Sequence, residues 1–120
     1  IDPESGEMEY AAAGEVHALI VGPADCQPLT ATATPLGADP DAPYRQATAT
    51  VAVGESLVLF NRGHLTPVDE EVLDADEGRA VAALVSLPRA TAEEQVRAVI
   101  EELTGESQPD RVVMVARRIF

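Results

Sequence analysis

The chain has no lysine, no tryptophan and a single cysteine, and these absences narrow the classes of function open to it. Every basic residue is an arginine, and the excess of acidic residues gives a formal net charge of −13 at pH 7. Nucleic acids and anionic membranes are bound through clustered positive charge, so we expect neither as a partner. Cys26 alone can form neither an intramolecular disulfide nor a cysteine zinc site, and a lone thiol suits a reducing compartment. We therefore expect a cytoplasmic protein.

Aromatic residues are scarce at 3%, so the core must be built mainly from valine, leucine, isoleucine and alanine. A length of 120 residues predicts one small domain, residues 1–120, around one modest core. No apolar run reaches the length of a membrane span, and the polar opening segment lacks the pattern of a signal peptide. That opening, which begins at Ile1, is typical of the middle of a protein, so we expect a fragment of a longer polypeptide.

The hydrophobic pattern predicts several strands, then two helices, then a final strand. Two short strands are expected in 8–14 and 15–22, meeting at a tight turn. Residues 45–61 predict two more, joined at Gly54 and Glu55, and the last strand is expected to span 111–120.

Capping residues place the two predicted helices. The first is expected from about Asp74 to Leu87, with Asp74 and Glu77 as an acidic cap pair at its N-terminus. The second begins at a capping box formed by Thr91 and Glu94. Its apolar residues recur at helical spacing and define the expected core face: Val96, Val99, Ile100 and Leu103.

This order of elements predicts an α+β fold, a mostly antiparallel sheet with two helices on one face. The run Leu57–Phe60 is apolar at every position, so it predicts a strand that is covered on both sides. The two helices cover only one side. We therefore expect the other face to be covered by a missing part of the domain or by a partner subunit.

Four segments carry a resemblance to a known family: "GEMEYAAAG", "ATPLGADPDAPYRQATATVAVGESLVLFNRG", "DEGRAVAALV" and "QPDRVVMVARR". In this order and spacing they resemble the C-terminal half of a SpoIIE/RsbU-like domain, a bacterial branch of the PPM-type serine/threonine phosphatases. The resemblance implies half of a two-sheet sandwich with outer helices. It also implies hydrolysis of phosphoserine or phosphothreonine by water activated between two manganese or magnesium ions, which carboxylates hold. The partners of this family are often phosphoproteins of sigma-factor circuits. The resemblance therefore implies that this chain binds an anti-sigma or anti-anti-sigma type phosphoprotein.

The chain departs from the family pattern where the metal ligands are expected. The family motif T-D-G is Asn61-Arg62-Gly63 here, and a guanidinium has no lone pair to offer a metal. Two adjacent aspartates before the last strand are replaced by Pro109 and Asp110, so Asp110 is the only surviving candidate ligand: it matches the second aspartate, or the first if the register shifts by one residue. The motif A-G-H is replaced by A-G-E. The residues of this vestigial site are Gly14, Glu15, Asn61, Arg62, Gly63 and Asp110.

We therefore expect no catalytic residue and no bound metal in this chain, which also lacks the N-terminal half of the family domain. The first interpretation is a degenerate phosphatase-like regulatory module that binds a protein partner. A second is part of an active manganese- or magnesium-dependent phosphatase, completed by residues outside this chain. A third is a structural domain that forms a homodimer through its uncovered sheet face.

Three smaller expectations concern single side chains. Arg62 is expected beside Asp110, where its charge would replace that of the metal, or else in solvent at the end of its strand. His17, within an apolar strand, is expected to be a half-exposed core residue, and His64 a loop residue. Cys26 is expected to be at least partly buried rather than a nucleophile.

Overall fold

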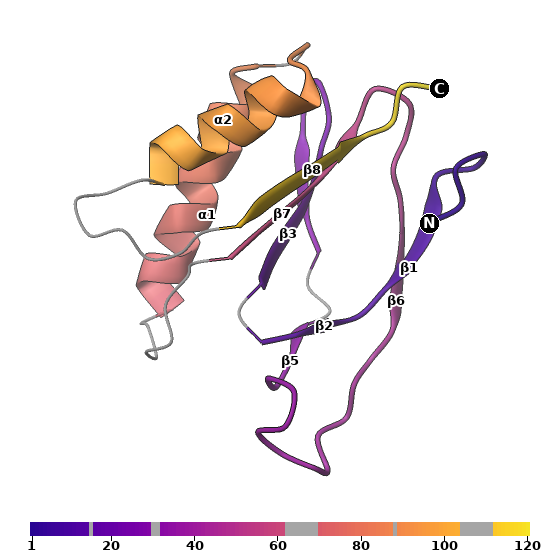
Figure 1. Ribbon diagram of the computed structural model, residues 1–120, viewed down its shortest axis with the longest axis vertical. Coiled ribbons are helices and arrows are strands. Elements are labelled where there is room, and N and C mark those ends of the chain that lie inside the picture. Colours follow the sequence, from indigo (N-terminus) through magenta and orange to yellow (C-terminus); the bar gives the residue numbers. More distant parts are fainter. Residues whose placement is uncertain (15, 30–31, 62–69, 88, 104–111) are drawn as a thin grey trace.

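The computed structural model describes residues 1–14, 16–29, 32–61, 70–87, 89–103 and 112–120, and within them it confirms an α+β fold (Figure 1). The elements follow in this order: β1 (Glu7–Tyr10), β2 (Ala12–Ala13), β3 (Val16–Val21), β4 (Cys26–Pro28), β5 (Thr32–Ala33), β6 (Ala47–Thr50), β7 (Ser56–Asn61), α1 (Glu70–Val85), α2 (Ala92–Leu103) and β8 (Val113–Arg117). Strands precede the helices and one strand follows them, as the hydrophobic pattern predicts.

The strands form one larger sheet and two small ones. The larger sheet has the order β4-β3-β7-β8, and all its neighbours are antiparallel. Strands β1 and β6 form a separate antiparallel pair, and β2 pairs with β5 in parallel. The two strands predicted on either side of Gly54 therefore belong to different sheets, since the turn at 51–55 carries the chain from one layer to the other.

The helices cover one face of the larger sheet and enclose the first core cluster. Side chains alternate along β7, so Val58 and Phe60 are fully buried against the helices. They pack with Leu19 of β3, with Leu84 of α1 and with Val99 of α2. This cluster contains a single aromatic residue, Phe60, in keeping with the aliphatic composition of the chain.

The opposite face of the larger sheet is covered in part by the β1–β6 pair, which corrects the expectation of an uncovered face. Figure 1 shows α1 and α2 on one side of β3, β7 and β8, and β1 and β6 on the other. A second core cluster lies between the two sheets and contains Met8, Ile20, Leu29 and Val51. Because Leu57 and Leu59 face this thinner layer, they are only half-buried, and the prediction of complete burial on both faces is wrong.

The first helix begins earlier than predicted. It spans Glu70–Val85, so Asp74 and Glu77 lie inside the helix and cannot cap its N-terminus. The error came from treating an acidic pair as a cap, although acidic residues are also common within the first turns of a helix.

The second helix begins at the predicted capping box. The Thr91 hydroxyl accepts a hydrogen bond from the Glu94 amide at 3.2 Å, and the Glu94 carboxylate accepts one from the Thr91 amide at 2.7 Å. The predicted core face is only half right, because Val99 and Leu103 are buried while Ile100 is 43% exposed. A polar residue, Gln95, completes the buried face instead.

Gln95 is buried without loss of hydrogen bonding because a serine of the sheet lies opposite. The Ser56 hydroxyl at the start of β7 donates a hydrogen bond of 2.8 Å to the Gln95 side-chain carbonyl, and both residues are buried. A buried polar group is tolerated where it finds such a partner. Hydropathy ranks glutamine as polar, so a core face defined by apolar residues does not include this position.

The C-terminal strand is shorter than predicted, and the residue after it joins both sheets. The Arg118 guanidinium donates to the backbone carbonyls of Ser5 and Val51, at 2.8 and 2.9 Å, and also to that of Glu4. The Arg118 backbone bonds to the turn that connects β6 to β7. Gly6 packs directly against this arginine and has a φ of +80°.

Candidate functional site

Asn61, the last residue of β7, fixes one end of the larger sheet. Its side-chain carbonyl accepts a hydrogen bond of 2.7 Å from the Val112 backbone amide. Its backbone amide donates a hydrogen bond of 3.2 Å to the Val112 backbone carbonyl. Asn61 therefore binds both backbone groups of the residue that precedes β8. The end of β7 and the start of β8 lie side by side, as expected from the resemblance.

Gly14 lies at the same end of the sheet, before β3. Its φ of +88° favours glycine, and its carbonyl accepts the Val16 amide at 3.1 Å in a tight turn. Val16 is the register partner of Asn61 across β3 and β7. A β-carbon placed on Gly14 would contact the Pro35 ring, so the segments "AAG" and "TPLG" lie together here.

Three adjacent strands thus bring the described parts of the vestigial motifs to one sheet end. The residues at this end are Gly14, Val16, Asn61 and Val112. Of the predicted site residues, Glu15, Arg62, Gly63 and Asp110 lie outside the described residues, as does His64. The convergence of the motif segments is therefore found, whereas the expected pairing of Arg62 with Asp110 stays a prediction.

A cavity between the two sheets opens beside this end. It has a volume of about 400 Å³, and apolar groups make up most of its lining, including Met8, Val16, Leu57 and Leu59. Glu9 supplies the one carboxylate among its described lining residues. A cavity of this kind suits apolar groups rather than a hard cation, which needs several oxygen ligands.

The described residues at the sheet end do not fit a centre of two metal ions. Asn61 offers the only side-chain oxygen among Gly14, Val16, Asn61 and Val112, and that oxygen accepts the Val112 amide. Across the described part of the chain, no group of three or more histidine, cysteine, aspartate or glutamate residues is placed to hold a metal.

The other two described side chains considered as candidates, His17 and Cys26, pack against core residues. The His17 ring stacks on the Phe60 ring with centroids 4.8 Å apart, and it is half-buried, as predicted. Cys26 is half-buried in β4 and packs against the first core cluster, also as predicted. Both residues contribute to packing in the described structure.

Sequence reasoning missed the structural use of Asn61 and Pro35. The resemblance matches Asn61 only to the first position of the T-D-G motif, although asparagine side chains commonly bond to nearby backbone. The contact between Pro35 and Gly14 joins segments that are far apart in sequence. The parallel pairing of β2 with β5 lies beside this contact and brings the two segments together.

A family model described as "Stage II sporulation protein E (SpoIIE)" matches residues 1–119. No curated protein and no solved structure matches the chain. In the described residues, neither helix has the length and apolar character needed to cross a membrane.

Proposed function

Because the chain belongs to the SpoIIE family of PPM-type phosphatase domains, we propose that it is a degenerate member that regulates by binding a protein partner and has no phosphatase activity of its own. The observation that carries this proposal is the arginine at position 62, where the family places a metal-binding aspartate. A guanidinium stays protonated at any physiological pH and repels a divalent ion.

Two further features support the loss of the metal site. Pro109 stands where the first of two adjacent aspartates is expected, so a second ligand is absent from the sequence. The side-chain oxygen of Asn61 is occupied by a backbone amide.

A domain that keeps the phosphatase fold but has lost phosphatase activity can still act by binding a partner protein. The acidic surface argues against nucleic acid, and the family suggests a phosphoprotein of the anti-sigma or anti-anti-sigma type. A cytoplasmic, bacterial setting is part of the same proposal. The homodimer alternative is less favoured, because β1 and β6 cover part of the sheet face through which the two copies would associate.

The second candidate is an active phosphatase completed by residues outside this chain. One observation favours it: the described parts of three family motifs still meet at one sheet end. This candidate requires Asp110 to act as a metal ligand despite the cation at position 62.

Manganese-dependent hydrolysis of p-nitrophenyl phosphate by the full-length protein distinguishes the two candidates. We expect no hydrolysis above the protein-free rate at saturating manganese, and no manganese binding by calorimetry. The matched variant Arg62→Asp restores one ligand and is expected to increase manganese affinity. Hydrolysis by the unmodified protein that is lost in Asp110→Asn would overturn the proposal and establish the second candidate.

A further inference from the structure

The outer edge of β6 is the feature on which a new inference rests. The Val51 amide donates to the Gly6 carbonyl at 3.0 Å, which makes these residues a hydrogen-bonded pair of the antiparallel ladder. Along an antiparallel ladder, hydrogen-bonded pairs alternate with pairs that are not hydrogen-bonded to each other. Met8 and Ala49 therefore form the next hydrogen-bonded pair, and the pairs of Thr50 with Glu7 and of Thr48 with Glu9 are of the other kind. The backbone groups of Thr48 and Thr50 therefore point away from β1.

In the described structure, the outward backbone groups at neighbouring edge positions are hydrogen-bonded within the chain, whereas those of Thr48 and Thr50 are not. The Ala52 amide, next in the outward series, donates to the Glu55 carboxylate at 2.8 Å. On the other edge of the pair, the Glu7 amide donates to the Ser5 hydroxyl and the Glu7 carbonyl accepts the Asp2 amide. Within the described structure, no hydrogen bond involves the outward groups of Thr48 and Thr50.

Strand β6 also lacks most of the devices that usually protect an edge. Its sequence, Ala-Thr-Ala-Thr, contains no proline and no charged residue, and threonine favours extended backbone, so its shortness, at four residues, is the one such device that the strand carries. A two-stranded sheet gains stability from a third strand. An extended polypeptide segment is the ligand that supplies the matching backbone donors and acceptors.

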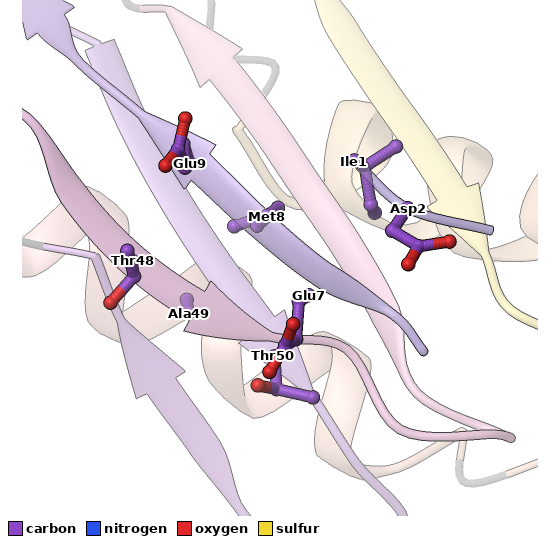
Figure 2. Close-up of a pocket in the computed structure, with 8 residues that line it drawn as sticks. All are labelled: Ile1, Asp2, Glu7, Met8, Glu9, Thr48, Ala49 and Thr50. Carbon is purple, nitrogen blue, oxygen red and sulfur yellow. The ribbon is translucent and has the colours of Figure 1, made fainter. Parts of the chain in front are cut away.

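The charge beside this edge determines which segment fits. Glu7 and Glu9 are exposed on the outer face of β1, next to Thr50 and Thr48 (Figure 2). Together with Asp2 they line a cavity of about 700 Å³, and none of the described residues in its lining is basic. Hydrogen bonds from the Glu4 amide and the Ser5 hydroxyl lower the pKa of Asp2, so this carboxylate is charged at neutral pH. Basic side chains complement this face.

The inner face of the pair sets the other half of the pattern. Met8 is buried there and Ala49 is half-buried, over the apolar space between the sheets. A strand added to β6 places alternate residues toward the acidic outer face and toward this apolar layer. Its sequence is therefore expected to alternate basic and apolar residues.

We propose that the β6 edge binds an extended segment of a partner protein, in which basic residues alternate with apolar ones, as an added strand. A second copy of this chain fits poorly, because each copy has a net charge of −13 and the two acidic faces would meet. The inference rests on the partner-binding part of the proposed function. It does not depend on the loss of phosphatase activity, which the manganese assay tests separately.

The test uses the full-length protein and a capped peptide of alternating arginine and valine as the probe, with binding followed by fluorescence anisotropy. Thr48→Pro removes the outward amide, which an edge strand tolerates, whereas Thr48→Val keeps the amide and serves as the matched control. We expect Thr48→Pro to weaken binding about tenfold and Thr48→Val to leave it nearly unchanged. A peptide of the same composition with its arginines and valines in two blocks is expected to bind less tightly.

Hydrogen exchange of the unmodified protein provides a second measurement that does not depend on the folding of Thr48→Pro. The peptide is expected to slow exchange of the Thr48 and Thr50 amides. Equal binding by the proline and valine variants, or by the block peptide, would show that charge alone attracts the probe and would overturn the proposal. Slow exchange of both amides in the full-length protein without peptide would also overturn it, because the edge would then be occupied within the same polypeptide.

Discussion

Substitution of Gly6 by alanine tests the structural role assigned to the junction of the two sheets. Gly6 is buried and has a φ of +80°, a conformation that costs a residue with a side chain about 1–2 kcal/mol. An added β-carbon would also lie inside van der Waals contact of the Val51 carbonyl oxygen and of the Arg118 guanidinium. One of those two groups must move.

The magnitude follows from the bonds that such a movement breaks. Val51 donates to Gly6 through its amide and accepts from Arg118 through its carbonyl. Loss of one of these bonds adds about 1–2 kcal/mol to the backbone strain, so we expect a total of about 2–4 kcal/mol. The free energy of unfolding of a domain of this size is about 5–15 kcal/mol, so the loss is easily measured by urea denaturation.

Two other glycines provide matched controls. Gly37 has a φ of +81° but no atom within 4 Å of an added β-carbon, so Gly37→Ala isolates the strain of the backbone alone. Gly78 lies within α1 and is equally uncrowded, so Gly78→Ala is expected to stabilise the protein by up to about 1 kcal/mol. If Gly6→Ala and Gly37→Ala reduce the free energy of unfolding equally, the steric argument is wrong.

Three further predictions concern other contacts. Thr91→Ala is expected to lower the free energy of unfolding by about 1 kcal/mol through loss of the capping box, whereas Thr91→Ser retains it in the same urea titration. Ser56→Ala leaves the Gln95 carbonyl buried without its partner and is expected to cost about 1–3 kcal/mol; no recovery on adding Gln95→Leu would argue against this account. The pKa of Asp2 is lower in the folded protein than its ordinary value of 3.8, so the charged carboxylate stabilises the fold above that pH. This contribution is lost as the pH falls through the lower folded value. Asp2→Asn should therefore weaken the decrease in the free energy of unfolding at acid pH.

Local patterns predicted the parts of the fold that depend on neighbours in sequence. The capping box at Thr91 forms as expected because its two partners are three residues apart, and the α+β class follows from the order of strands and helices. The start of α1 was predicted four residues too late from the same kind of local pattern, because an acidic pair fits both a cap and a helix interior. The burial of Gln95 could not be predicted, because its partner Ser56 is 39 residues away.

For the candidate site, the sequence by itself determined which side chain stands at position 62: Arg62 carries a guanidinium, which has no lone pair for a metal in any fold. Only the tertiary structure decided which segments meet. It placed Asn61 against Val112, brought Pro35 to Gly14, and put β6 in a sheet separate from β7, with an open edge. These outcomes depend on strand pairing between distant segments, and pairing is set by the burial of whole faces rather than by any local run of residues.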